Sequence, residues 1–428
     1  MKYVSTRKNE EKVSFQEAVI NGLSKNGGLY FPETVPTLPA SFFESIESLE
    51  NNEIAFQVLQ PFVAGSLTDE QLKAVIATTI TFPTPVVSVE KDVYALELFH
   101  GPTQAFKDVG ARFMSRCLSR FYRNKEEDVT ILVATSGDTG SAVAHGFFDL
   151  PGVAVTILFP KGKVSPFQEY QMTGLGKNIQ VIEVDGTFDD CQKLVKEAFN
   201  DVELRKKMAI SSANSINIAR LLPQMLYYFF AYKQLKSKLY KKELVVSVPS
   251  GNLGNLTAGL LAKKMGLPVK RFISAHNAND TFHLYLSSGE FTIKPSVLTY
   301  SNAMDVGNPS NFERIAYLYQ NDLELVKADV SSDRFGDEAT IREIKRCAEE
   351  NDYLTDPHGA VGLLALSESL KEGETGLFLE TAHPQKFSKI MVKALPDYPL
   401  KKVNLDDCHK VSLNNSYAAL REILIKES

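Results

Sequence analysis

Residues 129–144 read VTILVATSGDTGSAVA, an apolar run that leads through a glycine-containing loop into a stretch of small residues. The run from Val129 to Ala134 carries no charge, which is typical of a strand that is buried on both faces. The residues after Gly137 favour the start of a helix. A buried strand that passes directly into a helix is half of a β-α-β unit, from which parallel sheets are built. This stretch therefore predicts an α/β protein.

Similar apolar runs recur along the chain, separated by amphipathic stretches of helix length. They are Val153–Phe159, Ile179–Val184, Leu244–Val248, Arg271–Ala275 and Leu377–Leu379. This alternation predicts open, mainly parallel sheets flanked by helices. The first 80 residues differ, since they look mostly helical. Ser14-Phe-Gln-Glu17 resembles a capping box and predicts a short helix that ends near Gly22.

Composition excludes several classes of protein. Hydrophobic residues make up 44% of the 428 positions and charged residues 23%, close to the averages of globular domains, so disorder is not the dominant state. The 47 basic and 52 acidic residues give a net charge of −5, without a basic cluster. Nucleic acid is therefore not an expected partner.

The sequence also indicates a soluble protein of a reducing compartment. The first residues lack the apolar segment of a signal peptide, and Leu221–Leu235 contains Pro223 and Lys233 and is too short to span a bilayer. We expect this run to be a buried helix and no membrane association. The cysteines form no C-x-x-C pair, which argues against disulfides and thiolate metal sites; they are Cys117, Cys191, Cys347 and Cys408. We expect a cytoplasmic protein with no metal.

Two loops join a predicted strand to a predicted helix through glycine and hydroxyl residues. They are residues 134–141, ATSGDTGS, and residues 248–255, VPSGNLGN. Glycine lets the backbone approach a ligand, and the N–H groups at a helix N-terminus bind anions. Neither loop matches the dinucleotide or Walker pattern. On this evidence each loop is either an anion site or an ordinary tight turn.

Lys107 is a candidate reactive lysine because of its sequence context, the stretch LELFHGPTQAFKD over residues 96–108. Apolar residues at three- and four-residue spacing from Phe106 to Phe121 predict a helix, with Thr103 as its N-cap. Lys107 then lies near the positive end of the helix dipole, where burial and the dipole both favour a neutral amine. Such an amine attacks carbonyl groups and forms a Schiff base. The alternative is a surface lysine whose charge Asp108 balances.

Two further polar stretches are candidate binding sites. Residues 212–220, SANSINIAR, bring amides, hydroxyls and Arg220 together, and arginine is suited to bidentate contact with phosphate. Helix capping by asparagine or serine is the alternative for this stretch. Thr381 follows a predicted strand, at the sheet edge where ligands bind in open α/β sheets. The histidines follow no metal-binding pattern.

Six motifs taken together closely resemble the threonine synthase family. In order they are LFHGPTQAFKD (98–108), ATSGDTG (134–140), SANSIN (212–217), PSGNLGN (249–255), SNAMDV (301–306) and TAHPQKF (381–387). YVSTR (3–7) and GGLYFP (27–32) resemble the start of that family, so the resemblance covers nearly the whole chain.

The resemblance implies an enzyme of fold type II, similar to the β subunit of tryptophan synthase, with pyridoxal phosphate (PLP) as cofactor. The implied reaction is a lyase step that converts O-phospho-L-homoserine and water to L-threonine and phosphate, which completes threonine biosynthesis. The implied division is an N-terminal segment over residues 1–80, a large PLP-binding domain over 81–110 and 225–428, and a small α/β domain over 111–224. The expected partner is the small substrate, and no obligate protein partner is expected.

The resemblance also assigns roles by position. Lys107 matches the lysine that forms the Schiff base. The loop that holds the cofactor phosphate corresponds to Gly251, Asn252, Leu253, Gly254 and Asn255. Thr381 matches the hydroxyl that faces the pyridine nitrogen, and Asp138 lies near the phenolic oxygen. The implied substrate contacts are Thr135, Ser136 and Thr139 for the carboxylate, and Asn214, Asn217 and Arg220 for the phosphate.

Two positions depart from the family pattern. Leu253 stands where phenylalanine is usual, and Glu380 stands where glycine usually precedes the threonine. Leu253 would still contribute its backbone N–H, so we expect little effect. The carboxylate of Glu380 either changes the protonation of the pyridine nitrogen or points away from it. Two alternatives remain open: a PLP dehydratase or sulfhydrylase with a smaller substrate, and a relative that keeps the cofactor but has lost the reaction.

Overall fold

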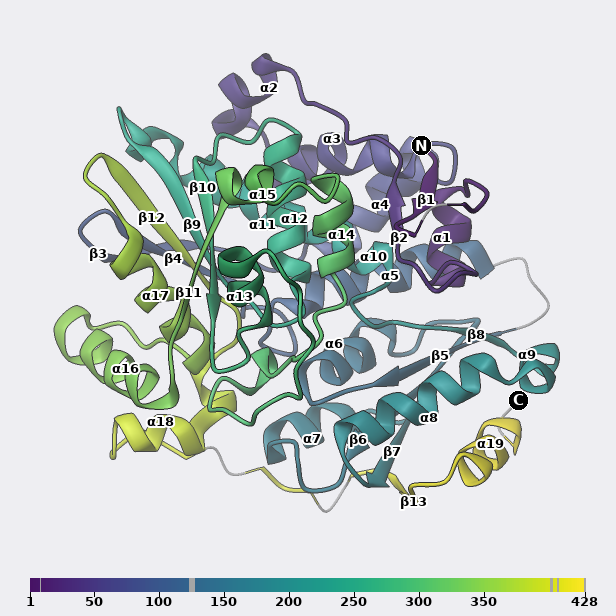
Figure 1. Cartoon of the computed structure of the whole chain (residues 1–428). Coiled ribbons are helices and arrows are strands. Elements are labelled where there is room, and N and C mark those ends of the chain that lie inside the picture. The colour runs from purple at the N-terminus through teal and green to yellow at the C-terminus, as the bar shows by residue number, and fades with distance from the viewer. Residues whose placement is uncertain (8, 123–127, 401–402, 406–407, 427–428) are drawn as a thin grey trace.

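The computed structural model describes residues 1–428 apart from 8, 123–127, 401–402, 406–407 and 427–428. Its strands form a six-stranded sheet, a five-stranded sheet and a two-stranded sheet near the N-terminus (Figure 1). Helices cover both faces of the two larger sheets, and most neighbouring strands in them are parallel. The predicted α/β class is therefore confirmed.

The N-terminal segment packs against the helix that begins with Lys107. The predicted capping box is present, since Ser14 Oγ accepts a hydrogen bond from Glu17 N at 3.2 Å and Glu17 Oε2 accepts one from Ser14 N at 2.7 Å. The segment contains β1 (Tyr3–Ser5), α1 (Phe15–Asn21), β2 (Tyr30–Pro32), α2 (Ala40–Ser45), η1 (Ile46–Ser48), α3 (Asn51–Val63) and α4 (Asp69–Thr79). Helices α1 and α4 contact α5 (Lys107–Tyr122).

The larger sheet has the strand order β11-β10-β9-β12-β4-β3. Its strands are β3 (Val86–Glu90), β4 (Val93–Glu97), β9 (Glu243–Pro249), β10 (Arg271–His276), β11 (Val330–Arg334) and β12 (Glu374–Glu380). Strand β3 runs antiparallel to β4, and the other neighbouring pairs are parallel. The loops that follow β4, β9 and β12 therefore leave the sheet at one edge.

Helices complete the layers around the larger sheet. Helix α17 contacts β9, β10, β11 and β12, while α12 contacts β10 and packs against α11. The helical elements of this part are α11 (Met225–Leu235), η3 (Lys236–Leu239), α12 (Gly254–Lys264), α13 (Thr281–Ser288), η4 (Asn302–Met304), α14 (Phe312–Leu318), α15 (Leu323–Asp329), α16 (Asp337–Asn351), α17 (Pro357–Ser369), η5 (Pro384–Phe387) and α18 (Ser388–Ala394).

The smaller sheet is parallel throughout, with the order β13-β7-β6-β5-β8. Its elements are β5 (Val129–Ala134), α6 (Asp138–Phe147), β6 (Val153–Pro160), α7 (Pro166–Thr173), β7 (Ile179–Asp185), α8 (Phe188–Asn200), α9 (Val202–Lys207), β8 (Ala209–Ser211), β13 (Val411–Asn414) and α19 (Tyr417–Lys426). In β5, Ile131 and Val133 join the core shared with α5, while Leu132 and Ala134 pack on the side of α8. Burial on both faces explains the uninterrupted apolar run.

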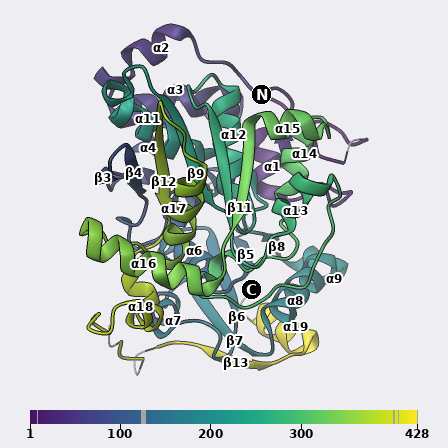
Figure 2. The ribbon, with the colours of Figure 1, turned by 60° about the vertical axis from the view of Figure 1, so that its left-hand side comes forward.

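The C-terminal strand and helix belong to the smaller sheet (Figure 2). Strand β13 pairs with β7, and α19 packs against α8. This differs from the division expected from the sequence, in which residues 225–428 all lie in the large domain. The physical reason is that Leu413, Leu420 and Leu424 complete the apolar cluster on the α8 face. The other domain boundaries remain predictions.

The apolar run Leu221–Leu235 is buried as predicted, but it is not one helix. It spans the end of α10 (Ile218–Leu221), the 3-10 turn η2 (Leu222–Gln224) and α11. Pro223 lies at the break, because proline lacks the N–H group that a continuous helix needs. Within the described residues, no helix is both long enough and apolar enough to cross a membrane. All four cysteines are free thiols.

Candidate active site

Three of the predicted site residues meet where the carboxyl ends of strands from the two large sheets face each other. Lys107 begins α5, Asp138 begins α6 directly after β5, and Thr381 follows β12. Lys107 Nζ lies 3.7 Å from Asp138 Oδ2. The N–H of Phe106, the residue before Lys107, donates to the carbonyl oxygen of Thr381 at 2.9 Å. The chain therefore brings the predicted lysine, carboxylate and hydroxyl residue together.

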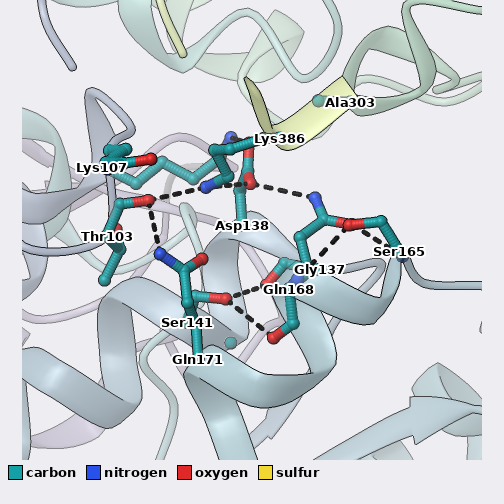
Figure 3. A network of polar contacts seen from close by, with 12 residues as sticks. Thr103, Lys107, Gly137, Asp138, Ser141, Ser165, Gln168, Gln171, Ala303 and Lys386 are labelled. Carbon is teal, nitrogen blue, oxygen red and sulfur yellow. Dashed lines mark hydrogen bonds and ion pairs between the residues drawn. The ribbon is translucent and has the colours of Figure 1, made fainter. Parts of the chain in front are cut away.

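Asp138 is the centre of a buried polar network (Figure 3). Lys386 Nζ lies 2.7 Å from Asp138 Oδ1, and Gln168 Nε2 donates to the same oxygen at 3.0 Å. The Lys386 side chain is fully buried and also donates to the carbonyl oxygen of Thr103 at 2.7 Å. Gln171 Nε2 donates to that carbonyl at 3.0 Å. Since Gln168 and Gln171 lie on α7, this network joins the two sheets.

Charge in this network favours an ionised Asp138 beside a readily deprotonated Lys107. Burial alone would raise the pKa of Asp138, but the cations Lys386 and Lys107 and the hydrogen bonds hold it well below its usual range. Burial lowers the pKa of Lys107, and the charges of Lys386 and Arg220 lower it further, against the opposing effect of Asp138. The Lys107 amine is thus prepared to act as a nucleophile or a base.

The loop between β5 and α6 is shaped by Thr135 and Gly137. The buried hydroxyl of Thr135 accepts hydrogen bonds from Gly137 N at 2.9 Å and Gly140 N at 2.8 Å. Gly137 has φ 135°, and a Cβ there would lie 2.5 Å from the Gln168 side chain. The hydroxyl of Thr135 therefore holds the loop. Ser136 is exposed and Thr139 is half-buried in the same loop.

The loop between β9 and α12 has the geometry of an anion cradle. Leu253 is the N-cap of α12 in the left-handed conformation, with φ 59°, and its side chain is buried in the core. This placement fits the expectation that Leu253 contributes its backbone. A Cβ at Gly251 would lie 2.8 Å from the Cα of Met304, so only glycine fits there. The first N–H groups of α12 lack partners within the helix and are free to bind an anion.

Two asparagines frame this cradle in different ways. Asn252 is locked by its neighbours, because its side chain donates to Ser215 Oγ and accepts from Ser310 N at 2.6 Å. Asn255 accepts a hydrogen bond from Tyr228 OH at 2.7 Å. Its buried Nδ2 has no hydrogen-bond partner among the described residues. Asn255 therefore offers a donor to a ligand.

In residues 212–220, some polar side-chain atoms form hydrogen bonds within the protein, and others are unpaired among the described residues. Arg220 is buried and donates through Nη1 to the carbonyl of Ala213, while its buried Nε has no partner in the described part of the chain. Burial lowers the pKa of Arg220 to about 10. The buried Oδ1 of Asn214 is likewise unpaired within the described residues.

Asn217 uses its amide for structure. Its Oδ1 accepts from Ala219 N at 3.0 Å and caps α10, and its Nδ2 donates to the carbonyls of Val19 and Ser212. Helix capping, the alternative named for this stretch, is the arrangement found here. The Arg220 side chain instead packs against α5. A Cβ added at Gly110, one turn after Lys107, would lie 3.2 Å from Arg220 Nε.

The start of α5 differs from the sequence prediction. The helix begins at Lys107, so Thr103 is not its N-cap. Instead, Thr103 donates to the buried carboxylate of Asp108, from Oγ1 at 2.6 Å and from N at 2.9 Å. Asp108 therefore faces Thr103 and does not balance Lys107. The segment between Thr103 and Asp108 is held by Tyr227 OH, which donates to the carbonyl oxygen of Phe106.

Glu380 points away from the strand end that carries Thr381. Its carboxyl accepts hydrogen bonds from Thr355 Oγ1 at 2.9 Å and from Asp356 N, both just before α17. Of the two possibilities left open by the sequence, the structure supports the second.

Two family profiles match the chain. The profile of the threonine synthase N-terminus matches residues 2–80, and that of pyridoxal-phosphate dependent enzymes matches residues 77–381. Threonine synthase of Escherichia coli strain K12 is 45% identical over an alignment of 434 positions that covers 99% of each chain. The chain belongs to the threonine synthase family.

Solved threonine synthases have the same fold. The crystal structure of threonine synthase from Escherichia coli superposes with a TM-score of 0.92 at 42% identity and covers all of both chains. PLP-bound threonine synthase from Brucella melitensis gives 0.93 at 33% identity, with 100% and 99% coverage. Maize serine racemase, at 16% identity and a TM-score of 0.56, shares the fold alone; it covers 78% of this chain and 92% of that one. The expected type II fold is confirmed.

The site fits the PLP cofactor of the threonine synthase family. A buried amine with a lowered pKa is available at Lys107 for the aldehyde. Gly251 lets the backbone of residues 303 and 304 pack closely beside the N-terminus of α12, whose first N–H groups lack partners within the helix, and Asn255 Nδ2 is a buried donor without a described partner. Lys386, Gln168 and Gln171 were not predicted as site residues. Lys386 lies in the TAHPQKF motif, which was the available signal for it.

Proposed function

We propose that this chain converts O-phospho-L-homoserine and water to L-threonine and phosphate. One observation carries the proposal: the Lys107 amine lies 3.7 Å from Asp138, and its pKa is lowered by the charge of the buried Arg220, whose Nε is unpaired among the described residues. The Gly251 loop supplies a second, separate anion site. A substrate with its own phosphate needs two such sites when the cofactor also carries one.

The residues that would hold PLP come from the ends of four strands, β4, β5, β9 and β12. Lys107 Nζ would hold the aldehyde carbon covalently, and the backbone N–H groups of 252–255 would bind the phosphate. The Thr381 hydroxyl would face the pyridine nitrogen and Asp138 the phenolic oxygen. Once bound, PLP supplies an electron sink that stabilises negative charge on the substrate Cα.

The remaining residues would bind and orient the substrate. The loop with Thr135, Ser136 and Thr139 would hold the carboxylate at the N-terminus of α6. Arg220 Nε, with Asn214 nearby in sequence, would bind the substrate phosphate. We leave Asn217 out of this site because its amide is engaged in structural bonds. Lys107 Nζ would take the proton from Cα, which its lowered pKa favours.

Lys386 would act through its neighbours as a positioning residue. Its ammonium group keeps Asp138 ionised and lowers the pKa of Lys107. We also infer two domains centred on the two large sheets, with residues 411–426 assigned to the smaller. The proposed partner is the small-molecule substrate.

A coupled assay tests the reaction. Purified protein with PLP and O-phospho-L-homoserine should release phosphate and threonine in equal amounts. Lys107→Ala should release neither and should not be trapped on PLP by borohydride. Retained turnover in Lys107→Ala, or phosphate release without threonine, would contradict the proposal.

A second experiment separates this function from that of a dehydratase with a smaller substrate. Removing one charged hydrogen bond in Arg220→Met should raise KM for O-phospho-L-homoserine roughly 10- to 100-fold. Any turnover of L-serine should be unaffected. Arg205→Met, which changes an exposed arginine, is the matched control. Equal losses with both substrates would favour the dehydratase.

A further inference from the structure

Glu380 and Asp356 form a buried pair of carboxyl groups at the junction of β12 and α17. Both side chains are fully buried. Glu380 accepts hydrogen bonds from Thr355 Oγ1 and Asp356 N, so its carboxyl lies against the backbone of the residue that carries the second carboxyl. Asp356 is the N-cap of α17 and accepts from His358 N at 2.8 Å. The pair therefore connects the central strand of the larger sheet to the helix that covers it.

The packing around this pair is complementary to it. A Cβ at Gly359 would lie 1.6 Å from Glu380 Oε2, so the glycine leaves the space that the carboxyl occupies. The other titratable groups around the pair are Glu97 on β4, and Cys347 and Tyr353 at α16. None of these three is a cation. Within the described residues, neither carboxyl forms an ion pair with a lysine or arginine, and the side chain paired with Asp356 is His358.

Two fully buried carboxyl groups at one junction, without a lysine or arginine paired to either, favour a shared proton. Asp356 Oδ2 is buried and has no donor in the described part of the chain, unless Glu380 carries a proton. Burial raises the pKa of Glu380 well above its usual value, and the charge of Asp356 raises it further. Glu380 is therefore neutral, and its proton is available to the unpaired Oδ2 of Asp356.

His358 extends the pair toward the active site. Its Nδ1 contacts Asp356 Oδ1, and its Nε2 accepts a hydrogen bond from Ala303 N at 3.1 Å. A ring nitrogen that accepts carries no proton, so the proton is on Nδ1 and the ring is neutral. Asp356 Oδ1 fixes this tautomer by accepting from Nδ1. The ring also packs against Phe387, next to Lys386, with centroids 4.8 Å apart.

The loop that His358 holds lies directly on the anion cradle. A Cβ at Gly251 would lie 2.8 Å from Met304 Cα and 3.0 Å from the Ala303 carbonyl oxygen. A displacement of residues 303 and 304 would therefore alter the space available at Gly251.

We propose that Glu380 and His358 are positioning residues for the cofactor phosphate. The neutral Glu380 carboxyl keeps Asp356 hydrogen-bonded, Asp356 fixes the His358 tautomer, and His358 holds Ala303 and Met304 against Gly251. This inference rests on the proposed function only in taking the Gly251 loop as the phosphate site.

Infrared difference spectroscopy tests the shared proton directly. Subtracting the spectrum of Glu380→Gln from that of the wild type near pH 7 should reveal the carbonyl band of a protonated carboxylic acid. The glutamine amide mimics the neutral acid in shape and can donate to Asp356. The absence of a protonated-acid band from the difference spectrum would overturn the proposal.

Cofactor binding to the apoenzyme tests the positioning role without any turnover. Equilibrium dialysis with PLP should give Glu380→Gln a Kd within about twofold of the wild type, because one neutral donor replaces another. Glu380→Ala and His358→Phe should each weaken binding about tenfold, the effect of one lost buried hydrogen bond. The phenylalanine keeps a ring against Phe387 but offers no acceptor to Ala303.

Glu374→Gln is the matched control, since Glu374 is a buried carboxylate at the other end of the same strand, paired with Arg271. It should leave the PLP Kd unchanged, and circular dichroism should show every variant folded. An unchanged Kd in folded His358→Phe, or an equal loss in Glu380→Gln and Glu380→Ala, would overturn the positioning role. Wild-type binding of PLP with threonine formation would leave the proposed function standing in either case.

Discussion

At the scale of single residues, Lys386 places a buried ammonium group between Asp138 and the carbonyl of Thr103. A buried cation is costly unless it is paired and hydrogen-bonded, and here both conditions hold. The sequence put Lys386 in a motif but gave no sign of its burial, because the short turn η5 has no periodic pattern. The place of Lys107 in the first turn of a helix was predictable, because a clear amphipathic pattern begins there.

Replacing Lys386 should change both stability and the reactivity of Lys107. Lys386→Met leaves Asp138 with one cation fewer, so we expect a loss of roughly 3–5 kcal/mol in the free energy of unfolding. The pKa of Lys107 should rise, because a neighbouring positive charge is removed. Borohydride trapping of PLP on Lys107 should then need a higher pH. Urea unfolding and the pH profile of trapping measure both effects. Lys389→Met, at an exposed position nearby, should change neither.

Asp108 should make the protein less stable as the pH rises from about 4 to about 6. Burial raises its pKa to about 6, although the hydrogen bonds from Thr103 oppose this. The value in an unfolded chain is about 3.9, so the folded state binds more protons between these two values. Up to about 3 kcal/mol of stability is lost across that range.

Asp108→Asn removes this titration. Between pH 4 and pH 7, the unfolding free energy of the wild type should fall by up to about 3 kcal/mol more than that of Asp108→Asn. Urea unfolding at the two pH values measures it. The exposed Asp149→Asn serves as the control. An identical pH slope in Asp108→Asn and wild type would show that Asp108 is not the group responsible.

At the scale of elements, the uniformly buried strands were predictable and the short edge strands were not. Strands β5, β6, β7, β9, β10 and β12 match the apolar runs, with small differences at their ends. Strands β11, with the sequence VSSDR, and β13, with VSLN, lie at the edges of their sheets. An edge strand does not need a long apolar run, so its sequence resembles that of a loop.

The junction of β5 and α6 depends on Gly137. Gly137→Ala would force a non-glycine residue to φ 135° and place its Cβ 2.5 Å from Gln168. We expect a loss of about 2–3 kcal/mol in stability and a lower kcat, because Gln168 would move from Asp138. Gly162→Ala is the control, because Gly162 also has a positive φ, 66°, but a new Cβ there would have no atom within 4 Å. It should lower the free energy of unfolding by about 1 kcal/mol and leave kcat unchanged. Similar kcat values for both variants would contradict this role of Gly137.

At the scale of the whole molecule, the sequence predicted the loops of the candidate site but not the contacts between them. Lys107, Asp138 and Thr381 come together because parallel strands deliver their carboxyl ends to one place. The bonds of Gln168 to Asp138 and of Gln171 to Thr103 join residues far apart in the chain. A local pattern holds no information about such pairs, which depend on how the two sheets pack.

The outer face of the smaller sheet should unfold more readily when its C-terminal cover is weakened. Leu420→Ala removes a fully buried side chain of α19 from the cluster with α8, at a cost of about 2–5 kcal/mol. Hydrogen exchange should accelerate in β6 and β7, while β9, β10 and β12 keep their protection. Leu298→Ala, at an 85% exposed leucine, is the control. Uniform acceleration in both sheets would contradict this.

Strand β13 pairs with β7, although strands β9 to β12 lie between them in the sequence. During translation, β7 leaves the ribosome long before its outer neighbour has been synthesised. Until then, the backbone N–H and C=O groups on the β13 side of β7 are free to pair with another nascent chain. We therefore expect newly made chains to depend on a chaperone during this interval, and slow elongation through the codons for β9 to β12 to increase aggregation.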